Sequence, residues 1–184
     1  MGSNNDISLK ALAKINLGLD VVRRREDGYH EVRMIMQTIH LYDRLDIKRT
    51  KEPGIQIQTN LSFLPVNENN LIYKAAKLLM DEFSITDGVS VKLDKRIPVA
   101  AGMAGGSTDA AAMLIGVNRL FSLGLTKREL MERGVQIGAD VPYCIMRGTA
   151  LAEGIGEALS PLPPMVKCPV LILSLIHISE PTRP

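Results

Sequence analysis

A glycine-rich loop between a strand pattern and a helix pattern constrains this chain more than any other segment. Residues 89–94 alternate apolar and polar side chains, which predicts a strand, and Ala110–Phe121 is almost entirely apolar, which predicts a buried helix. The first amides of a helix have no internal partner and lie at the positive end of its dipole. The glycines of Pro98–Thr108 would let an anion approach those amides. The segment therefore predicts a phosphate-binding loop, in which Ser107 or Thr108 caps the helix or contacts a metal ion.

The glycine spacing matches neither of the two common phosphate-binding signatures. The loop reads Gly102-x-x-Gly105-Gly106-Ser107, whereas a Walker A loop reads G-x-x-x-x-G-K-[ST] and a dinucleotide-binding turn reads G-x-G-x-x-G. The pattern by itself leaves a second interpretation open, in which the glycines only allow a tight, closely packed turn from strand to helix.

Length and charge exclude several classes of protein. The 184 residues suit one domain, or one domain and part of another. A net charge of +2, from 22 basic and 20 acidic residues, argues against a nucleic acid or a membrane surface as the main partner. Cys144 and Cys168 lack metal-site spacing, and we find neither a signal peptide nor an apolar run of membrane length. We therefore expect a cytoplasmic protein with reduced thiols.

The N-terminal region predicts two extended segments, at residues 7–13 and 17–22, separated by Lys14-Ile15-Asn16. Lys14 and Asn16 could be solvent-facing residues of an edge strand, or could project an ammonium and an amide into a site. A turn at Asp27-Gly28 precedes Tyr29 and His30, which could stack on and hydrogen-bond a flat ring. A structural role for His30 is the plainer alternative.

Further elements follow from periodicity and capping signals. Asp140-Val141-Pro142 predicts a turn or cap, and its functional alternative is a carboxylate base. The apolar spacing after Asn69 or Asn70 predicts a helix, and Thr126–Glu129 is a capping box for another helix, ending near Gly138. The predicted strands, with a turn at Asp43-Arg44 between the first two, are residues 34–41, 44–50, 55–59, 88–94, 149–153, 156–159 and 168–173.

Three of these segments resemble a known family. Ala13–Leu17, Pro98–Ala110 and Gly138–Pro142 resemble the superfamily of galactokinase, homoserine kinase, mevalonate kinase and phosphomevalonate kinase. One branch of that superfamily phosphorylates 4-diphosphocytidyl-2-C-methyl-D-erythritol in the non-mevalonate route to isoprenoid precursors. The motif Asp27–His30, together with Lys14 and Asn16, resembles the motifs of that branch. The four motifs occur in the family's order.

The resemblance implies a role for each matching residue. Asp140 corresponds to the catalytic carboxylate that receives or orients the substrate's hydroxyl proton, and Lys14 to the catalytic ammonium beside it. Substrate contacts are implied for Asn16, Tyr29 and His30, with the last two at the cytosine. ATP contacts are implied for Asn70 and Leu71 near the adenine and for the loop residues Pro98, Val99, Ala100, Ala101, Gly102, Met103, Ala104, Gly105, Gly106, Ser107 and Thr108. Mg²⁺ is expected with ATP, in contact with Ser107 or Thr108.

The resemblance also implies a fold and a domain layout. The expected fold is α+β: a mixed sheet packed by helices, with a left-handed β-α-β unit that departs from the general preference for right-handed crossovers. Residues 1–160 fit the N-terminal ATP-binding domain, and residues 161–173 fit the start of a second, ferredoxin-like domain that is largely missing. Residues 174–184 resemble a translated sequencing adaptor rather than the family, so we expect a non-native tail.

The expected activity is ATP-dependent phosphorylation of the 2-hydroxyl of the cytidyl diphosphate substrate, giving the 2-phosphate and ADP. Two alternatives remain open from the sequence: another small-molecule kinase of the superfamily, or a nucleotide-binding fragment without catalysis. The expected partner is this small molecule, not nucleic acid or membrane, and the expected state is a monomer or weak homodimer.

Overall fold

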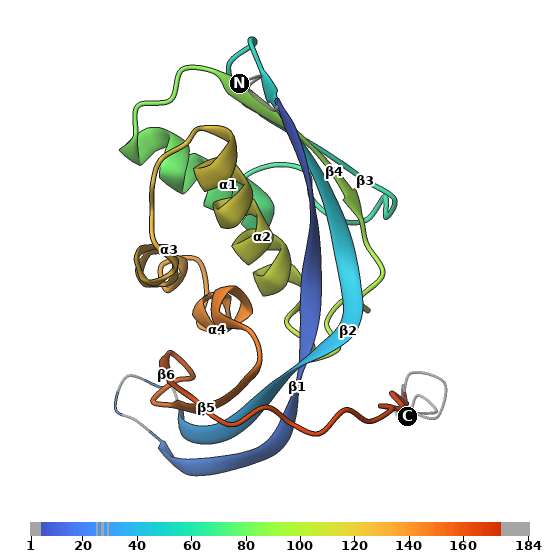
Figure 1. Cartoon of the computed structure of the whole chain (residues 1–184), viewed down its shortest axis with the longest axis vertical. Coiled ribbons are helices and arrows are strands. Elements are labelled where there is room, and N and C mark those ends of the chain that lie inside the picture. Colours follow the sequence, from blue (N-terminus) through green and yellow to red (C-terminus); the bar gives the residue numbers. More distant parts are fainter. Residues whose placement is uncertain (1–4, 25, 27, 29, 174–184) are drawn as a thin grey trace, which may run out of the picture.

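A computed structural model describes residues 5–24, 26, 28 and 30–173 of the chain (Figure 1). Tyr29, Asp27 and the tail 174–184 lie outside the described residues. In chain order the elements are β1 (Asp6–Arg24), β2 (His30–Thr50), β3 (Ile55–Thr59), α1 (Leu71–Glu82), β4 (Gly88–Asp94), α2 (Gly105–Leu120), α3 (Lys127–Gly134), α4 (Val141–Met146), β5 (Thr149–Glu153) and β6 (Ala158–Pro161).

The described strands form one mixed sheet with the helices on one face (Figure 1). The strand order is β3-β4-β2-β5-β6, and β1 pairs with β2 along its length. The β3–β4 pair is parallel and α1 connects its two strands, whereas the other pairs are antiparallel. This α+β arrangement confirms the expected fold class. Within the described residues, no helix combines the length and apolar character needed to span a membrane.

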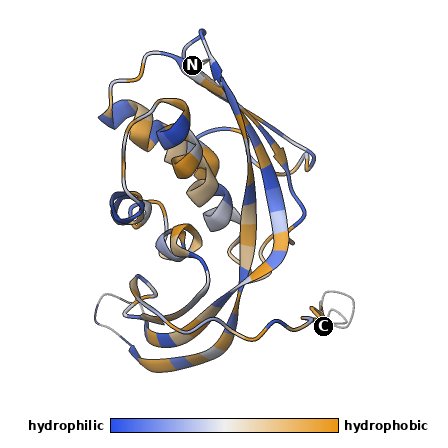
Figure 2. Ribbon diagram, viewed as in Figure 1, coloured by the Kyte–Doolittle hydropathy of each residue, from blue (hydrophilic) through white to orange (hydrophobic). Residues whose placement is uncertain are grey.

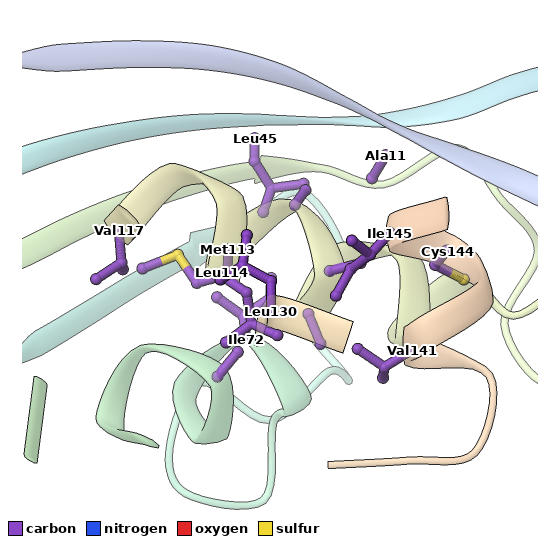
Figure 3. Close-up of a cluster of buried hydrophobic side chains, with 14 of the residues drawn as sticks. Ala11, Leu45, Ile72, Met113, Leu114, Val117, Leu130, Val141, Cys144 and Ile145 are labelled. Carbon is purple, nitrogen blue, oxygen red and sulfur yellow. The ribbon is translucent and has the colours of Figure 1, made fainter. Parts of the chain in front are cut away.

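The main core lies between the sheet and the helices. Leu45 of the sheet and Met113 and Leu114 of α2 point toward one another there (Figure 3). Gly116 lies within α2 where the helix approaches β2 closely, since a Cβ at this position would lie 2.4 Å from Cδ1 of Ile47. The strands alternate hydrophilic and hydrophobic residues, and α3 is mostly hydrophilic (Figure 2). The buried helix α2 therefore fixes the position of the glycine-rich loop that precedes it.

Local capping signals correctly predicted the starts of α1 and α3. The side chain of Asn70 accepts a hydrogen bond from the Ile72 amide at 2.9 Å and begins α1. Thr126 and Glu129 form the expected capping box of α3. The end of α3 was predicted wrongly, because the helix stops at Gly134 rather than near Gly138.

Three predictions about strands and turns were wrong. The turn expected at Asp43-Arg44 does not exist, because β2 runs unbroken from His30 to Thr50 and Asp43 is fully buried. Residues 168–173 form no strand, although they are apolar. The strand expected at residues 156–159 is β6, which is displaced to Ala158–Pro161. The short helix α4 was not predicted, because six residues are too few to show a helical period.

Candidate active site

A cavity of about 660 Å³ lies against the glycine-rich loop. Every loop residue from Pro98 to Ser107 lines it, together with Asn70 and Leu71 at the start of α1. Lys14 and Asn16 of β1 and Asp140 also line it. The structure therefore gathers residues from distant parts of the sequence around one space.

The loop presents open amides to this cavity. The first intrahelical bond of α2 runs from the Thr108 amide to the Ala104 carbonyl at 2.8 Å, so the amides of Gly105, Gly106 and Ser107 precede the helical hydrogen bonds. Ala104 is the N-cap, and no side chain caps the helix. The prediction that Ser107 or Thr108 caps α2 is therefore wrong, and the open amides can accept an anion.

Lys14 is fixed by the irregular pairing of β1 with β2. Its register shifts between Leu12 and Lys14 and again between Asn16 and Gly18, where the sequence predicted an interruption. The Lys14 amide donates to the Met103 carbonyl at 3.2 Å, which ties β1 to the loop. The hydroxyl of Thr108 donates to the Leu12 carbonyl at 2.8 Å. Strand, loop and helix thus hold the Lys14 side chain at the cavity.

The Lys14 ammonium lies beside two polar groups of the site. Its Nζ donates to Oδ1 of Asn16 at 3.1 Å and lies 3.9 Å from Oδ2 of Asp140. The Lys14 side chain is only 6% exposed, whereas that of Asp140 is 32% exposed, so the ammonium is held within the protein and the carboxylate reaches solvent. This arrangement supports the functional interpretation of Lys14 and Asn16 over that of solvent-facing edge residues.

Asp140 stands at the N-cap of α4 without capping it. Its side chain makes no capping hydrogen bond, which leaves the carboxylate available to the cavity and to Lys14. The helix behind it is anchored by Tyr143, whose hydroxyl donates to the Gly148 carbonyl at 2.6 Å and lies 3.1 Å from that of Thr38. Burial raises the pKa of Tyr143 to about 12, so the phenol stays protonated.

Three charged residues that the sequence analysis did not assign to the site lie beside the loop. Asp43, Lys95 and Asp109 are buried, and Lys95 pairs with both carboxylates. Lys95 and Asp109 also line the cavity. An acid directly before the apolar run Ala110–Val117 was a usable signal for Asp109, whereas Asp43 had the sequence signature of a turn.

Two predicted site residues are not in the described cavity lining. His30 begins β2, where it pairs with Arg24, and is exposed. Thr108 is 2% exposed and its hydroxyl is directed to β1. Tyr29 lies outside the described residues, so the predicted contacts to cytosine stay predictions.

Comparison with known proteins defines the class. Residues 70–148 match the family described as GHMP kinases N terminal domain. The fold is also that of a homoserine kinase from Cytophaga hutchinsonii, with a TM-score of 0.69 over 89% of this chain and 53% of that one at 16% identity. Residues 70–148 thus correspond to a GHMP kinase N-terminal domain, and the described residues have the fold of that domain.

The chain is also similar to kinases that share one name. It is 63% identical over 167 residues to the 4-diphosphocytidyl-2-C-methyl-D-erythritol kinase of Lachnoclostridium phytofermentans, covering 91% of this chain and 57% of that relative. It is 64% identical to the protein of that name from Lachnospira eligens, covering 90% of this chain and 58% of the relative. A crystal structure of 4-(cytidine 5'-diphospho)-2C-methyl-D-erythritol kinase is 38% identical with a TM-score of 0.74, covering 85% of this chain and 55% of that one. The chain thus spans a little more than half the length of these relatives.

Proposed function

We propose that this chain supplies the ATP-binding and catalytic residues for phosphorylating the 2-hydroxyl of 4-diphosphocytidyl-2-C-methyl-D-erythritol, with the 2-phosphate and ADP as products. One observation carries the proposal: Nζ of Lys14 lies 3.9 Å from Oδ2 of Asp140 in the cavity that the glycine-rich loop lines. The names of the most similar relatives support this acceptor over those of other kinases in the family.

Phosphoryl transfer needs placement and charge neutralisation more than covalent help from the protein. The open amides at the start of α2 would hold the phosphates of ATP, and the Lys14 ammonium would neutralise charge on the transferred group. The acceptor is a tertiary alcohol, which is too weakly acidic to ionise beforehand. Its proton would pass to the Asp140 carboxylate as the new P–O bond forms and the bond to ADP breaks.

The family resemblance implies Mg²⁺, and the residues at the loop fit a site shared with phosphates. Mg²⁺ prefers oxygen ligands and is commonly held by few protein groups together with substrate phosphates. Ser107 would provide such an oxygen, because it lines the cavity, whereas the Thr108 hydroxyl is directed to Leu12. When bound, the ion would neutralise phosphate charge.

The remaining expectations are part of the same proposal. We assign residues 1–160 to the ATP-binding domain and residues 161–173 to the start of the next domain, and we assign cytosine recognition to Tyr29 and His30. A cytoplasmic location and a monomer or weak homodimer stay predictions, and size-exclusion chromatography with light scattering tests the oligomeric state.

Replacing Asp140 separates catalysis from binding. Asp140→Asn removes the proton acceptor, so turnover should fall by about 10³-fold, as is typical for loss of a general base. The affinity for a non-hydrolysable ATP analogue should stay within about twofold, because the loop is unchanged. Asp20→Asn is a matched control, since Asp20 is an exposed carboxylate of β1. Near-normal turnover of Asp140→Asn would exclude the proposed role.

A further inference from the structure

The segment that enters the glycine-rich loop is fixed through its backbone. The Asn60 side chain donates to the Lys95 carbonyl at 3.0 Å and accepts from the Lys95 amide at 2.8 Å. Oδ1 of Asp43 accepts from the amides of Arg96 and Ile97, the latter at 2.8 Å. The chain therefore reaches Pro98 from a position that β2 and Asn60 determine.

The side chain of Lys95 joins this segment to the helix after the loop. Its ammonium pairs with Oδ2 of Asp43 and, at 2.9 Å, with Oδ2 of Asp109 in the second turn of α2. No side chain of the three is more than 4% exposed. A Cβ at Gly105 would lie 2.8 Å from Nζ of Lys95, so the glycine that begins α2 leaves the space the ammonium occupies. We call Asp43, Lys95 and Asp109 the loop clasp.

The loop between these two anchors has a strained backbone. Ala100, Gly102 and Ala104 have φ of 57°, 69° and 56°, in the left-handed region. Two of the three carry a Cβ, for which this region is unfavourable. Left-handed residues at alternate positions turn backbone amides toward one concave side, which is a geometry that binds anions. Such strain persists only where the surrounding structure enforces it.

We propose that the loop clasp is a positioning device: by fixing both ends of the loop, it holds Ala100 and Ala104 in the strained, phosphate-binding conformation before the nucleotide arrives. This inference rests on the proposed nucleotide-binding function. A loop that is already shaped for the ligand loses less free energy to ordering on binding, so an intact clasp should increase affinity. Lys95, Asp43 and Asp109 act here through the loop.

A direct contact between Asp109 and the nucleotide is the competing explanation. Oδ1 of Asp109 is buried, has no hydrogen-bond partner among the described residues, and belongs to a residue that lines the cavity. A test must therefore distinguish an effect through the loop from an effect through this oxygen.

The affinity of this chain for a non-hydrolysable ATP analogue, measured by calorimetry, tests the clasp. Asp109→Ala should weaken binding about tenfold, because the tie between Lys95 and α2 is lost. Asp109→Asn should restore affinity to within about threefold of the unchanged chain, since an amide oxygen can still accept from Lys95. Asp94→Asn is the matched control: Asp94 pairs with Arg96 in the same segment but is 38% exposed, so no change is expected.

A second substitution identifies the route of the effect. Ala104→Gly removes the penalty for the left-handed conformation, so added to Asp109→Ala it should recover most of the lost affinity. If the double variant does not recover nucleotide affinity, the proposal is overturned in favour of direct contact. A tenfold loss of affinity in Asp109→Asn would overturn it in the same way. If Asp109→Ala does not fold, Asp109→Leu takes its place and should show the same tenfold loss, because it fills the buried space, cannot accept from Lys95 and leaves the pair of Lys95 with Asp43 intact.

The outcomes separate this inference from the proposed function. If the unchanged chain binds no nucleotide, the proposed function fails and the clasp inference fails with it. If the unchanged chain binds the analogue and folded clasp variants bind it equally well, only the clasp inference is overturned.

Discussion

Asp43→Ala should cause a large loss of stability. The carboxylate is fully buried, accepts from the amides of Arg96 and Ile97, and pairs with the Lys95 ammonium. Each buried amide left without an acceptor costs about 1–3 kcal/mol. Removing one partner of a buried ion pair costs about 3–5 kcal/mol, and the low end applies because the Lys95 ammonium still donates to Oδ2 of Asp109.

These contributions give a loss of about 5–9 kcal/mol in the free energy of unfolding, against a total of about 5–15 kcal/mol for a typical domain. Urea unfolding at pH 7, followed by circular dichroism, measures the loss. Asp43→Asn should lose only about 3 kcal/mol, because the ion pair with Lys95 is lost while the amide oxygen can still accept from both backbone amides.

Asp46→Ala is the matched control for this prediction. Asp46 lies on the same strand and pairs with Arg44, but its side chain is 43% exposed, so its loss should stay below about 1 kcal/mol. A loss below about 1 kcal/mol for Asp43→Ala would refute the reasoning. Equal losses for Asp43→Ala and Asp43→Asn would refute the part assigned to the two amides.

Two further predictions concern stability. Burial raises the pKa of Asp109 to about 8, against the lowering effect of the Lys95 ammonium, so the folded state retains a proton that the unfolded state loses near pH 4. The free energy of unfolding should therefore fall as pH rises from about 4 to 8, by at most about 1.4 kcal/mol per pH unit from this group. Urea unfolding at several pH values measures this slope, which should be flatter in Asp109→Asn. An unchanged slope would contradict the raised pKa of Asp109. Thr126→Ala should lower the free energy of unfolding by about 1 kcal/mol, because the capping box of α3 is lost, and an unchanged urea midpoint would show that the box contributes nothing.

The sequence predicted best those features that neighbouring residues determine. The capping box at Thr126, the Asn70 cap and the strand-loop-helix order around Gly105 each depend on a few consecutive residues. The gathering of Lys14 and Asp140 at the loop came from resemblance to a family, because 126 positions separate them and no local pattern connects them.

The failures involve partners distant in sequence. Asp43-Arg44 has a turn-like composition, yet β2 continues because the Asp43 carboxylate finds its partners at residues 95–97. Residues 168–173 have strand-like composition but no described strand pairs with them. Such outcomes depend on tertiary contacts, which propensity alone does not encode.

The central claim is that nucleotide and acceptor alcohol bind side by side in the cavity between the glycine-rich loop and the Lys14–Asp140 pair. An amide chemical-shift titration of this chain tests it most directly, first with a non-hydrolysable ATP analogue and then with 4-diphosphocytidyl-2-C-methyl-D-erythritol. We predict the largest shifts for residues 100–108 with the nucleotide, followed by shifts at Lys14, Asn16 and Asp140 with the second ligand. Shifts confined to other surfaces, or none with either ligand, would contradict the account.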